Sequence, residues 1–397
     1  MKFELPPEVI DISNTFVDDD FEIYVVGGAV RDLLMGRAVT DWDFTTNATP
    51  QEIQKLIPDS YYNNAYGTVG VKPKNIDFKP HEITTFRSEQ GYSDKRRPDS
   101  VTWGSSLTED LERRDFTVNA IALRYAQGKQ DYELVDPFGG QEDIKNKIIR
   151  AVGDPLARFN EDALRMMRAI RIASELGFQI EEKTFDAIKM HAASIRQIAM
   201  ERVRDEFLKT LGSPNPYEGV VMLRNSGLMS EILPELETTF GVEQKSPGRH
   251  HIYDVGTHSL LALKNCGSSD PITRFATLIH DIGKPRTQRT RDGIITFYNH
   301  EMESGKIARL LAKRFRLSND QSEQLYKLVR WHQFTVDERQ TDSSIRRFIK
   351  NVGLDLVEEM LALRVGDRLG GGATETSWRL EEFKERLVEV QKQPFAV

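Results

Sequence analysis

The sequence predicts an α+β protein in which strands and helices alternate first and helices alone follow. Through residue 140, short β-branched runs are broken by Gly, Pro and Asn, which favours strands joined by turns. From Gln141 onward the apolar spacing is helical, and helix-capping residues stand where helices are expected to begin or end. A chain of 397 residues is too long for one hydrophobic core, so we expect several domains.

The individual elements follow from local composition. Apolar or β-branched runs predict strands at 21–26, 41–46, 68–71, 82–86 and 133–135. Helix-forming stretches predict helices at 50–57, 163–176, 183–193 and 201–211. Asp154 or Asn160 is suited to cap a helix, and Gly177 to end one.

The composition is that of an ordinary soluble protein, and its one cysteine is expected to be reduced. Apolar residues make up 39% and charged residues 29% of the chain, and the formal net charge is −7. No apolar run approaches membrane-spanning length, and Met1 to Asp20 lacks a signal-peptide pattern. Cys266 is the only cysteine, which excludes an internal disulfide and favours the cytoplasm. Segments 145–171 and 284–316 are rich in basic residues, so an RNA partner stays open despite the net charge.

The first motif joins a Gly-Gly turn to two carboxylates. Gly27 and Gly28 follow an apolar strand, so their backbone can approach phosphate oxygens and the amides of the next helix can face an anion. Asp41 and Asp43 stand two apart in a predicted strand, so both carboxylates leave the same face. Such oxygen ligands suit Mg²⁺ carrying a nucleoside triphosphate. The alternative is a tight turn beside a solvated acidic strand.

A second motif places two adjacent arginines before a strand-like Phe-Thr-Val. Arg113 and Arg114 are compatible with a surface salt-bridge cluster. Beside a triphosphate site, however, Arg114 becomes a candidate for phosphate or ribose contact, because guanidinium binds phosphate oxygens bidentately.

A third motif forms a polar stripe on a predicted helix. Asp162, Arg165, Arg168 and Arg171 recur every three residues, next to an apolar stripe. An exposed helix with i,i+3 ion pairs is one interpretation. The other is a nucleobase template: Asp162 accepts a hydrogen bond from the amino group of cytosine or adenine while Arg165 donates one to the ring nitrogen. Uracil and guanine would set an acceptor against the carboxylate, at a cost of about 1–3 kcal/mol.

Together these motifs resemble the class II tRNA nucleotidyltransferases, the CCA-adding enzymes, which share ancestry with bacterial poly(A) polymerases. The resemblance rests on the Gly-Gly-x-Val-Arg-Asp turn with Asp41 and Asp43, and on the Arg-Arg-Asp-Phe-Thr-Val-Asn-Ala segment. Val-Asp-Pro-Phe-Gly-Gly at 135–140 and the Glu-Asp-x-x-Arg stripe complete it. It implies a nucleotidyltransferase head with a small mixed sheet (1–140), a helical neck with the base template (141–215) and a helical body (216–397).

The family's activity and site residues carry over by position. The resemblance implies addition of C, C and A to tRNA 3′ ends from CTP and ATP with Mg²⁺, with the acceptor arm of tRNA as partner. Asp41 and Asp43 would hold Mg²⁺, Glu82 is a weaker candidate for a third carboxylate, and Arg114 would be catalytic. The nucleotide-binding residues would be Gly28, Arg31, Arg114, Asp162, Arg165, Arg168 and Arg171.

One loop distinguishes CCA-adding members of this family from CC-adding ones. The stretch 85–98 looks full length, and its Gly, Ser and charged residues suit a mobile lever that reshapes the pocket between C and A. This favours all three additions over a CC- or A-adding relative, and the unmodified Gly-Gly turn disfavours a poly(A) polymerase. The chain ends at Pro-Phe-Ala-Val, where relatives continue, so we expect the tail to be short or missing.

A fourth constellation resembles the HD phosphohydrolase superfamily. His258, His280, Asp281 and Asp367 follow its ligand order, which implies an HD domain at about 245–370. His300 and His332 fall where a second metal could be completed. Imidazole and carboxylate ligands suit a divalent transition metal, which could support phosphoester hydrolysis on RNA ends or nucleotides. Two alternatives therefore stay open: an RNA-end phosphohydrolase whose head only binds nucleotide, and a non-catalytic RNA-binding protein. The oligomeric state is left open, and no membrane partner is expected.

Overall fold

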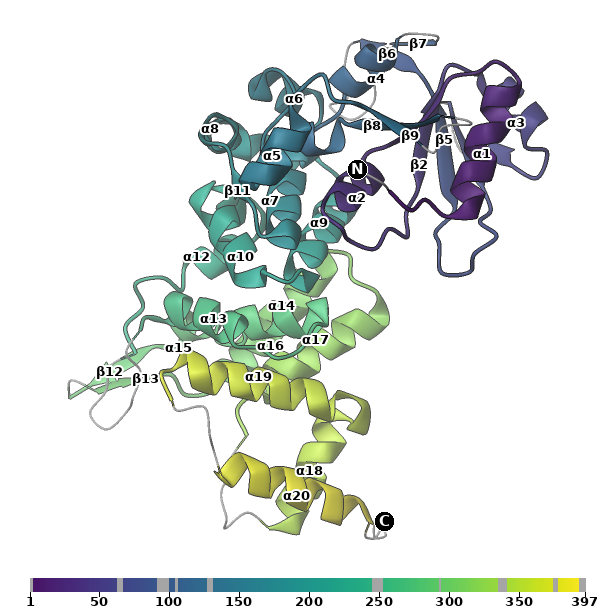
Figure 1. Ribbon diagram of the computed structural model, residues 1–397. Helices are drawn as coiled ribbons and strands as arrows, with labels where there is room; N and C mark the ends of the chain where they lie inside the picture. The colour runs from purple at the N-terminus through teal and green to yellow at the C-terminus, as the bar shows by residue number, and fades with distance from the viewer. Residues whose placement is uncertain are drawn as a thin grey trace. The chain divides into compact units, whose positions relative to one another are not determined.

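The computed structural model divides the chain into two compact units (Figure 1). One comprises Met1–Ala173 with Gly177–His191, and the other Ser174–Leu176 with Ala192–Val397. The structure describes residues 3–62, 67–90, 100–103, 106–126, 131–244, 253–292, 294–334, 341–373 and 378–392. The division falls inside one helix, and the predicted domain boundaries after residues 140 and 215 stay predictions. In the described part of the chain, no helix is long and apolar enough to cross a membrane.

A mixed seven-stranded sheet organises the first unit, in the order β3-β4-β5-β2-β1-β8-β9. β2 and β5 are parallel, and the other neighbouring strands are antiparallel. The α+β prediction with a small mixed sheet is confirmed. The strands are β1 (Ile23–Val26), β2 (Asp43–Thr46), β3 (Tyr61–Tyr62), β4 (Thr68–Val71), β5 (His81–Thr85), β8 (Ala122–Ala126) and β9 (Asp131–Val135).

The alternation of side chains along the strands gives the sheet two different faces. Ile23 and Val25 of β1, with Phe44 of β2, are buried in a core that includes side chains of α1 (Pro7–Asp18) and α3 (Pro50–Leu56). Because side chains alternate along a strand, Asp43 leaves the opposite face. On that face Val26 packs with Leu111 of α4 (Leu107–Glu112).

A separate hairpin and further helices complete this unit. β6 (Arg87–Gln90) pairs antiparallel with β7 (Ser100–Trp103). The predicted lever loop falls largely on residues 91–99, which lie outside the described residues. The remaining helices and short elements are α2 (Gly28–Leu34), η1 (Thr117–Asn119), α5 (Gly140–Asn146), β10 (Ile148–Ile149), α6 (Pro155–Glu161), α7 (Leu164–Leu176), β11 (Gln179–Ile180) and α8 (Glu182–His191).

Local signals set the ends of α6 and α7. Asp154 accepts a hydrogen bond from the amide of Ala157 at the start of α6, as predicted, whereas Asn160 lies inside that helix. Gly177 ends α7 with a φ of 69°, a left-handed conformation that favours glycine. The short parallel pair β10–β11 was not predicted, because two-residue strands carry no periodicity of their own.

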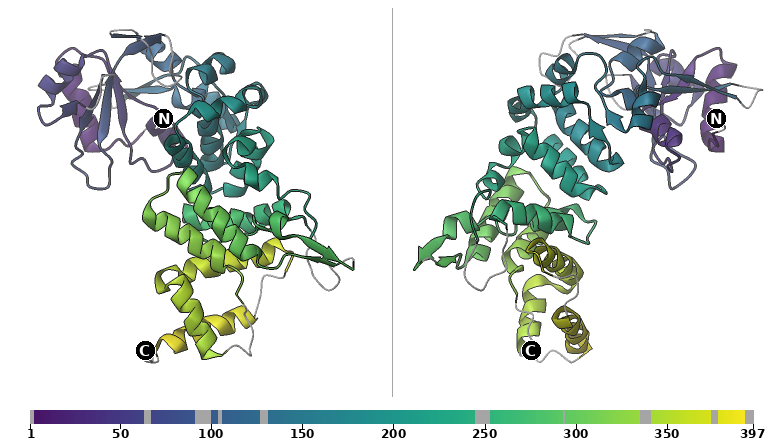
Figure 2. Two further views of the ribbon diagram at one scale, coloured as in Figure 1. Left: turned by 180° about the vertical axis from the view of Figure 1, so that it is seen from behind. Right: turned by 60° about the vertical axis from the view of Figure 1, so that its left-hand side comes forward.

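The second unit is almost entirely helical. Its helices are η2 (Ala192–Gln197), α9 (Met200–Gly212), α10 (Pro216–Asn225), α11 (Leu228–Ile232), α12 (Pro234–Glu237), α13 (Val255–Lys264), α14 (Pro271–Ile279), α15 (Lys284–Thr287), α16 (His300–Arg314), α17 (Asn319–Trp331), α18 (Asp342–Val352), η3 (Leu354–Leu356), α19 (Val357–Gly370) and α20 (Trp378–Lys392). A hairpin of β12 (Arg289–Arg291) and β13 (Ile294–Thr296) reaches away from the helices in both views of Figure 2.

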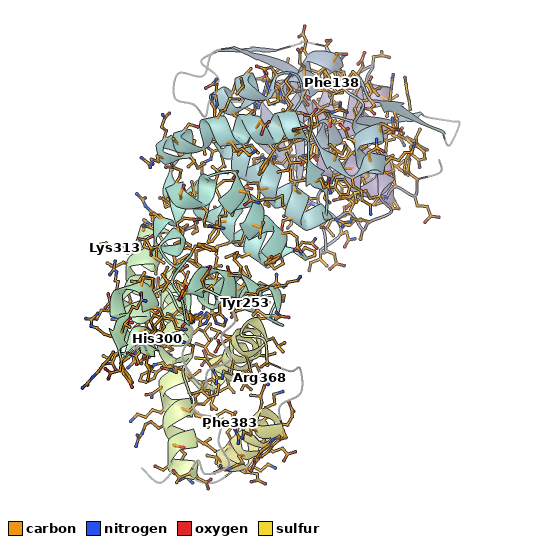
Figure 3. The ribbon with its side chains drawn as sticks, turned by 90° about the vertical axis from the view of Figure 1, so that its left-hand side faces the viewer. Phe138, Tyr253, His300, Lys313, Arg368 and Phe383 are labelled. Carbon is orange, nitrogen blue, oxygen red and sulfur yellow. The ribbon has the colours of Figure 1, made fainter. Side chains whose placement is uncertain are left out.

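Aromatic clusters hold these helices together. Phe207 of α9 packs against Phe275 of α14 and Phe315, with ring centroids 5.3 and 5.6 Å apart. Phe383 of α20, labelled in Figure 3, lies 5.4 Å from Phe348 of α18 and so attaches the last described helix. The chain's final residues, 393–397, lie outside the described part, so the expected short tail stays untested.

Glycines allow a close helix contact in this unit, between α13 and α19. A Cβ on Gly366 would lie 2.6 Å from the carbonyl oxygen of Ala262, and one on Gly370 would lie 2.6 Å from the Ala262 amide nitrogen. No larger residue fits either position without moving a backbone. This contact carries Asp367, which follows Gly366, toward His258 of α13.

Candidate active sites

Three carboxylates, those of Asp41, Asp43 and Glu82, lie close together at the face of the sheet from which Asp43 projects. Asp43 is paired in register with Glu82 on the neighbouring parallel strand, so both side chains leave the same face. Burial, followed by the charges of Asp41 and Glu82, raises the pKa of Asp43 to about 6, although Arg114 and Lys79 act in the opposite direction. Burial and the charge of Asp41 also raise the pKa of Glu82. These groups repel one another, and a divalent cation would relieve that repulsion; the residues present fit such an ion.

The strand that carries this site is shorter than predicted. β2 begins at Asp43, and Asp41 precedes it as an exposed residue. Asp41 accepts a hydrogen bond from the ammonium of Lys79 at 2.7 Å, while the carbonyl of Thr40 accepts from the Lys79 amide. The backbone of this segment therefore bonds to the loop before β5 instead of continuing the ladder. Asp41 nevertheless acts electrostatically on both other carboxylates.

The Gly-Gly turn lies against an arginine from the second motif. Gly27 has a φ of 74°, and a Cβ there would lie 3.2 Å from Nη1 of Arg114. Arg31 donates to Asn119 at 2.8 Å and to the adjacent Asp32 at 2.9 Å, so its guanidinium is held in place. The structure thus brings Arg114, Gly27 and the Asp43 carboxylate together. Their roles stay predictions.

Asp110 is a member of this site that sequence reasoning missed. Its fully buried carboxylate receives hydrogen bonds from Arg113 at 2.6 Å and from the Thr45 hydroxyl at 3.1 Å, and Arg114 lies 3.5 Å away. Burial lowers the pKa of Arg114, which reflects the cost of enclosing its charge. The arginine pair is therefore no surface cluster. The i,i+3 and i,i+4 spacing from Asp110 to the pair was the available signal.

The polar stripe of α7 is half-buried, while Leu164, Met167 and Ile170 beside it are buried. Asp162 accepts a hydrogen bond from the amide of Leu164 at 3.0 Å at the start of the helix. Arg165, the predicted partner of Asp162 in base selection, forms an ion pair with Glu161 and donates to the Arg113 carbonyl at 3.2 Å.

The two remaining arginines lie further along the same helix. Arg168 donates to Asp115 at 2.8 Å, and Arg171 occupies the next half-buried position. Burial alone would raise the pKa of Asp115, but the charges of Arg168 and Arg165 lower it to about 2. Asp115 belongs to the second motif, so the stripe is attached to the segment that carries Arg114. Base selection by the stripe stays a prediction.

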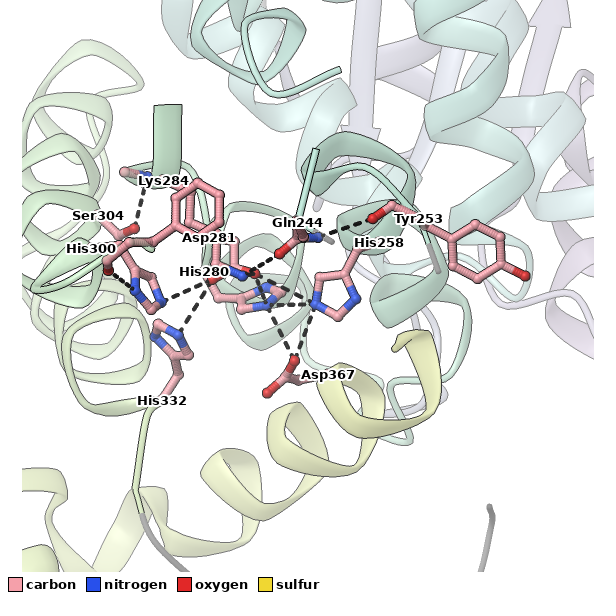
Figure 4. A network of polar contacts seen from close by, with 12 residues as sticks. Gln244, Tyr253, His258, His280, Asp281, Lys284, His300, Ser304, His332 and Asp367 are labelled. Carbon is pink, nitrogen blue, oxygen red and sulfur yellow. Dashed lines mark hydrogen bonds and ion pairs between the residues drawn. The ribbon is translucent and has the colours of Figure 1, made fainter. Parts of the chain in front are cut away.

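The histidine cluster assembles from five helices and the turns at their ends (Figure 4). Nε2 of His258 lies 3.2 Å from Nε2 of His280 and 3.1 Å from Oδ1 of Asp367. Asp281 lies between the two halves of the cluster, with Oδ2 3.2 Å from His280 and Oδ1 3.1 Å from His300. The sequence predicted these residues as metal ligands, and the structure brings their side chains together; their metal binding stays a prediction. His332 is 3.7 Å from the same Oδ1, where the second metal was predicted.

Backbone hydrogen bonds fix which nitrogen of each ring faces inward. Nδ1 of His280, His300 and His332 each lies 2.7 to 2.9 Å from a carbonyl three residues earlier. A proton on Nδ1 satisfies that carbonyl and leaves the Nε2 lone pair pointing into the cluster. This donor set of imidazole nitrogens and carboxylate oxygens fits one or two divalent transition-metal ions.

The electrostatics of the cluster favour a positive charge at its centre. Burial alone would lower the pKa of His280, but Asp281 and Asp367 raise it to about 10. Burial alone would raise the pKa of both carboxyls, but neighbouring cations around Asp281, and hydrogen bonds from His258 and His280 to Asp367, hold both pKa values well below their usual range. One of these cations is Lys284, whose buried ammonium lies 2.6 Å from Asp281 and 2.6 Å from Gln244. Sequence reasoning had placed Lys284 only in a general basic segment.

A cavity of about 290 Å³ lies beside the cluster. Its lining includes His300 and Lys284, so a bound group would reach the cluster from this side. The lining residues are Gln244, Lys284, Thr296, Phe297, Tyr298, Asn299, His300, Glu301 and Gln333.

Three family descriptions match successive parts of the chain. Residues 23–150 match "Poly A polymerase head domain", which covers the carboxylate site. Residues 177–240 match "Probable RNA and SrmB- binding site of polymerase A", and residues 249–368 match "HD domain".

Known relatives carry one recurrent name. A CCA-adding enzyme of Geobacillus sp. (strain WCH70) is 48% identical over 222 residues, covering 56% of this chain and 53% of that protein. One of Anoxybacillus flavithermus is 40% identical over 275 residues, covering 69% of this chain and 64% of that protein. The alignments thus span little more than half the length of the first of these relatives. The Bacillus stearothermophilus CCA-adding enzyme in complex with CTP has a similar structure, with a TM-score of 0.70 and 29% identity over 97% of this chain and 83% of that one.

Proposed function

Because the chain belongs to the class II tRNA nucleotidyltransferase and poly(A) polymerase family, we propose that it adds C, C and A to tRNA 3′ ends from CTP and ATP. The observation that carries the proposal is the group of three carboxylates, Asp41, Asp43 and Glu82, beside the enclosed guanidinium of Arg114. The name of the curated relatives and the CTP bound by the related structure support the choice of substrates. The cytoplasm stays the expected location, since tRNA would be the partner.

The reaction is an in-line phosphoryl transfer. The 3′-hydroxyl oxygen of the tRNA ribose bonds to the α-phosphorus of the bound nucleotide, the hydroxyl proton is released, and the bond to the leaving oxygen breaks to give pyrophosphate. Asp41 and Asp43 would hold Mg²⁺, which lowers the pKa of the attacking hydroxyl and offsets charge on pyrophosphate when it is bound. Arg31 and Arg114 orient the triphosphate and balance its negative charge.

The α7 stripe selects the base in this proposal. Asp162 accepts from the exocyclic amino group of C or A, and Arg165 donates to the ring nitrogen. Glu161 holds the Arg165 guanidinium, which limits its rotation before the nucleotide binds. The Asp162 carboxylate rejects uracil and guanine because those bases present a second acceptor to it, and the held Arg165 guanidinium keeps the donor in place.

Sequencing of tRNA 3′ ends tests the nucleotidyltransferase. A tRNA lacking its CCA end is incubated with CTP, ATP, UTP and GTP, each alone and in combination. We expect CC from CTP alone, CCA from CTP with ATP, and no addition from UTP or GTP, with Asp43→Asn inactive and Asp77→Asn as an active control. Ends that stop at CC, or long A tracts, would instead identify a CC-adding or a poly(A)-adding relative. No incorporation of labelled CTP would reject the proposal.

A second function is favoured by the histidine cluster. We propose that the HD region hydrolyses phosphate esters at RNA ends or on nucleotides with a divalent transition metal. His258, His280, Asp281 and Asp367 would hold the ion, which would supply Lewis-acid activation of water when bound. The water oxygen bonds to phosphorus, the bond from phosphorus to the ribose oxygen breaks, and that oxygen takes a proton. The convergent Nε2 atoms with fixed Nδ1 partners support this proposal.

Separate variants distinguish the two activities. His280→Ala or Asp281→Asn removes phosphate release from adenosine 3′-phosphate and leaves CTP incorporation. Asp41→Ala has the opposite effect. If neither wild-type activity were detected while tRNA was retained on the protein, a non-catalytic RNA-binding protein would be the better description.

A further inference from the structure

The β12–β13 hairpin and the cavity beside the histidine cluster form a continuous feature that neither reaction above uses. The hairpin reaches away from the helical unit (Figure 2), and all three residues of β12 are exposed. The chain that leaves β13 becomes the wall of the cavity, through Thr296, Tyr298 and Asn299, and then enters α16 at His300.

Cationic and aromatic side chains lie along this feature, together with neutral polar groups and the carboxylate of Glu301. Tyr298 lines the cavity and is 76% exposed, so its ring is open to solvent. Arg289 and Arg291 lie on β12, and the ion pair of Arg291 with Asp292 spans 3.8 Å with both side chains about 90% exposed or more. A pair exposed to this degree is weak, so the guanidinium can exchange Asp292 for another anion.

The inner end of the cavity contains a buried ammonium that is paired with a carboxylate. Lys284 lines it and is 7% exposed, and its ammonium lies 2.6 Å from Asp281. His300 lines the cavity and contacts Asp281 as well, so the cavity lies against one side of the cluster. Figure 4 shows Lys284 and His300 on either side of Asp281. A phosphate placed here would meet Lys284 and lie beside the proposed metal ligands.

We propose that the cavity and hairpin bind the 3′ end of a single-stranded RNA, so that the HD region acts on polynucleotide ends in preference to mononucleotides. The terminal phosphate enters the cavity toward Lys284, the terminal base stacks on Tyr298, and phosphates further back along the strand contact Arg289 and Arg291. Stacking on an aromatic ring is tolerant of sequence, and arginine contacts with the backbone are too. This inference rests on the proposed phosphohydrolase function and names its substrate class.

The discriminating test compares two substrates on the full-length, metal-loaded protein. The substrates are adenosine 3′-phosphate and an RNA octamer that ends in a 3′-phosphate, and phosphate release is measured for each. We expect wild-type kcat/KM to be higher for the octamer. Tyr298→Ala, and separately the double change Arg289→Ala with Arg291→Ala, should lower kcat/KM for the octamer roughly tenfold or more. For the mononucleotide the double variant should stay within about twofold, because a single nucleotide does not reach the hairpin.

Trp378→Ala and Arg379→Ala serve as matched controls, because both residues are exposed and lie on α20. Both control variants should keep the wild-type kcat/KM for each of the two substrates. Equal losses on the two substrates in the double variant, or no loss on either, would overturn the inference while the hydrolytic function stands.

A binding measurement separates failure of the inference from failure of the hydrolase. If wild-type protein hydrolyses neither substrate, the HD activity is rejected. Fluorescence anisotropy with a labelled octamer then decides on the surface alone. Weaker binding by the hairpin variants than by the α20 variants supports the RNA surface, and equal binding overturns it.

Discussion

At the scale of the residue, the ionised carboxylate site lowers the stability of the folded protein. The folded protein raises the pKa of Asp43 from 3.8 to about 6. The protonated form is therefore the one that the fold favours. The contribution of the protonated Asp43 carboxyl to the free energy of unfolding is complete below about pH 4 and is lost as the pH rises through about 6. Above that pH the ionised Asp43 opposes folding.

Asp43→Asn should consequently raise the free energy of unfolding at pH 8 by about 2 kcal/mol, because it removes a partly buried, repelled charge. Urea denaturation without divalent cations measures the change. The gain should shrink at pH 4, where the wild-type carboxyl is protonated. Asp77→Asn, at an exposed position, should change neither value. A loss of stability in the Asp43→Asn variant at pH 8 would contradict the electrostatic account.

Asp110 has the opposite effect, since its buried charge compensates two arginines. Asp110→Asn should lower the free energy of unfolding by about 3 kcal/mol, the usual result of removing one partner from a buried ion pair. It should also raise KM for CTP more than it lowers kcat, because Arg114 loses the group that orients it. Glu109→Gln, an exposed neighbour on the same helix, is the control. An unaltered KM would assign Asp110 to folding alone.

At the scale of the element, Gly366 and Gly370 let α19 pack closely against α13. This packing brings Asp367 into contact with His258. A Cβ at position 366 would lie 2.6 Å from a backbone oxygen, so Gly366→Ala must push α19 away from α13. We expect a loss of about 1–3 kcal/mol in stability. We also expect transition-metal affinity to fall at least about tenfold, measured by isothermal titration calorimetry. Gly212→Ala is the control, because its Cβ would meet only an atom 3.8 Å away. Equal metal affinity in both variants would contradict this geometry.

The observed strands also show which strand ends can be predicted from sequence patterns and which cannot. β4 was predicted with both ends correct and β1 with its final residue correct, because buried β-branched runs are bounded by Gly and polar residues. The predicted β1 began two residues early, at Phe21. The predicted β2 began two residues early, since alternation cannot reveal that the Thr40 carbonyl bonds to a distant loop. The pair β10–β11 depends entirely on partners brought together by folding.

The same limit applies to the sites. Candidate metal ligands such as His280 and Asp281 are unusual enough in order and spacing to be recognised along the chain. Asp110 and Lys284 are common residue types whose importance comes from burial beside a partner. Burial depends on packing, so composition around these positions gave no signal beyond helical spacing.

At the scale of the whole molecule, each of the two compact units contains one of the two proposed metal sites, the carboxylate site in the first and the histidine cluster in the second. Calorimetry should therefore resolve ligand effects by unit. Mg²⁺ with CTP should raise the melting temperature of the first unit, and Mn²⁺ alone should raise that of the second, because a ligand stabilises the state that binds it.

Single substitutions provide the controls for this experiment. Asp43→Asn should abolish the shift with CTP and keep the shift with Mn²⁺, and Asp367→Asn should do the reverse. If one substitution abolished both shifts, the units would not bind their ligands independently.

The contact between His258 and Asp367 joins positions 109 residues apart in the chain. An ion held by both would act as a removable cross-link, closing a long loop in a protein whose single buried cysteine cannot form an internal disulfide. Closing so long a loop restricts the unfolded chain strongly. A chelator would then be to this protein what a reducing agent is to a disulfide-bonded one.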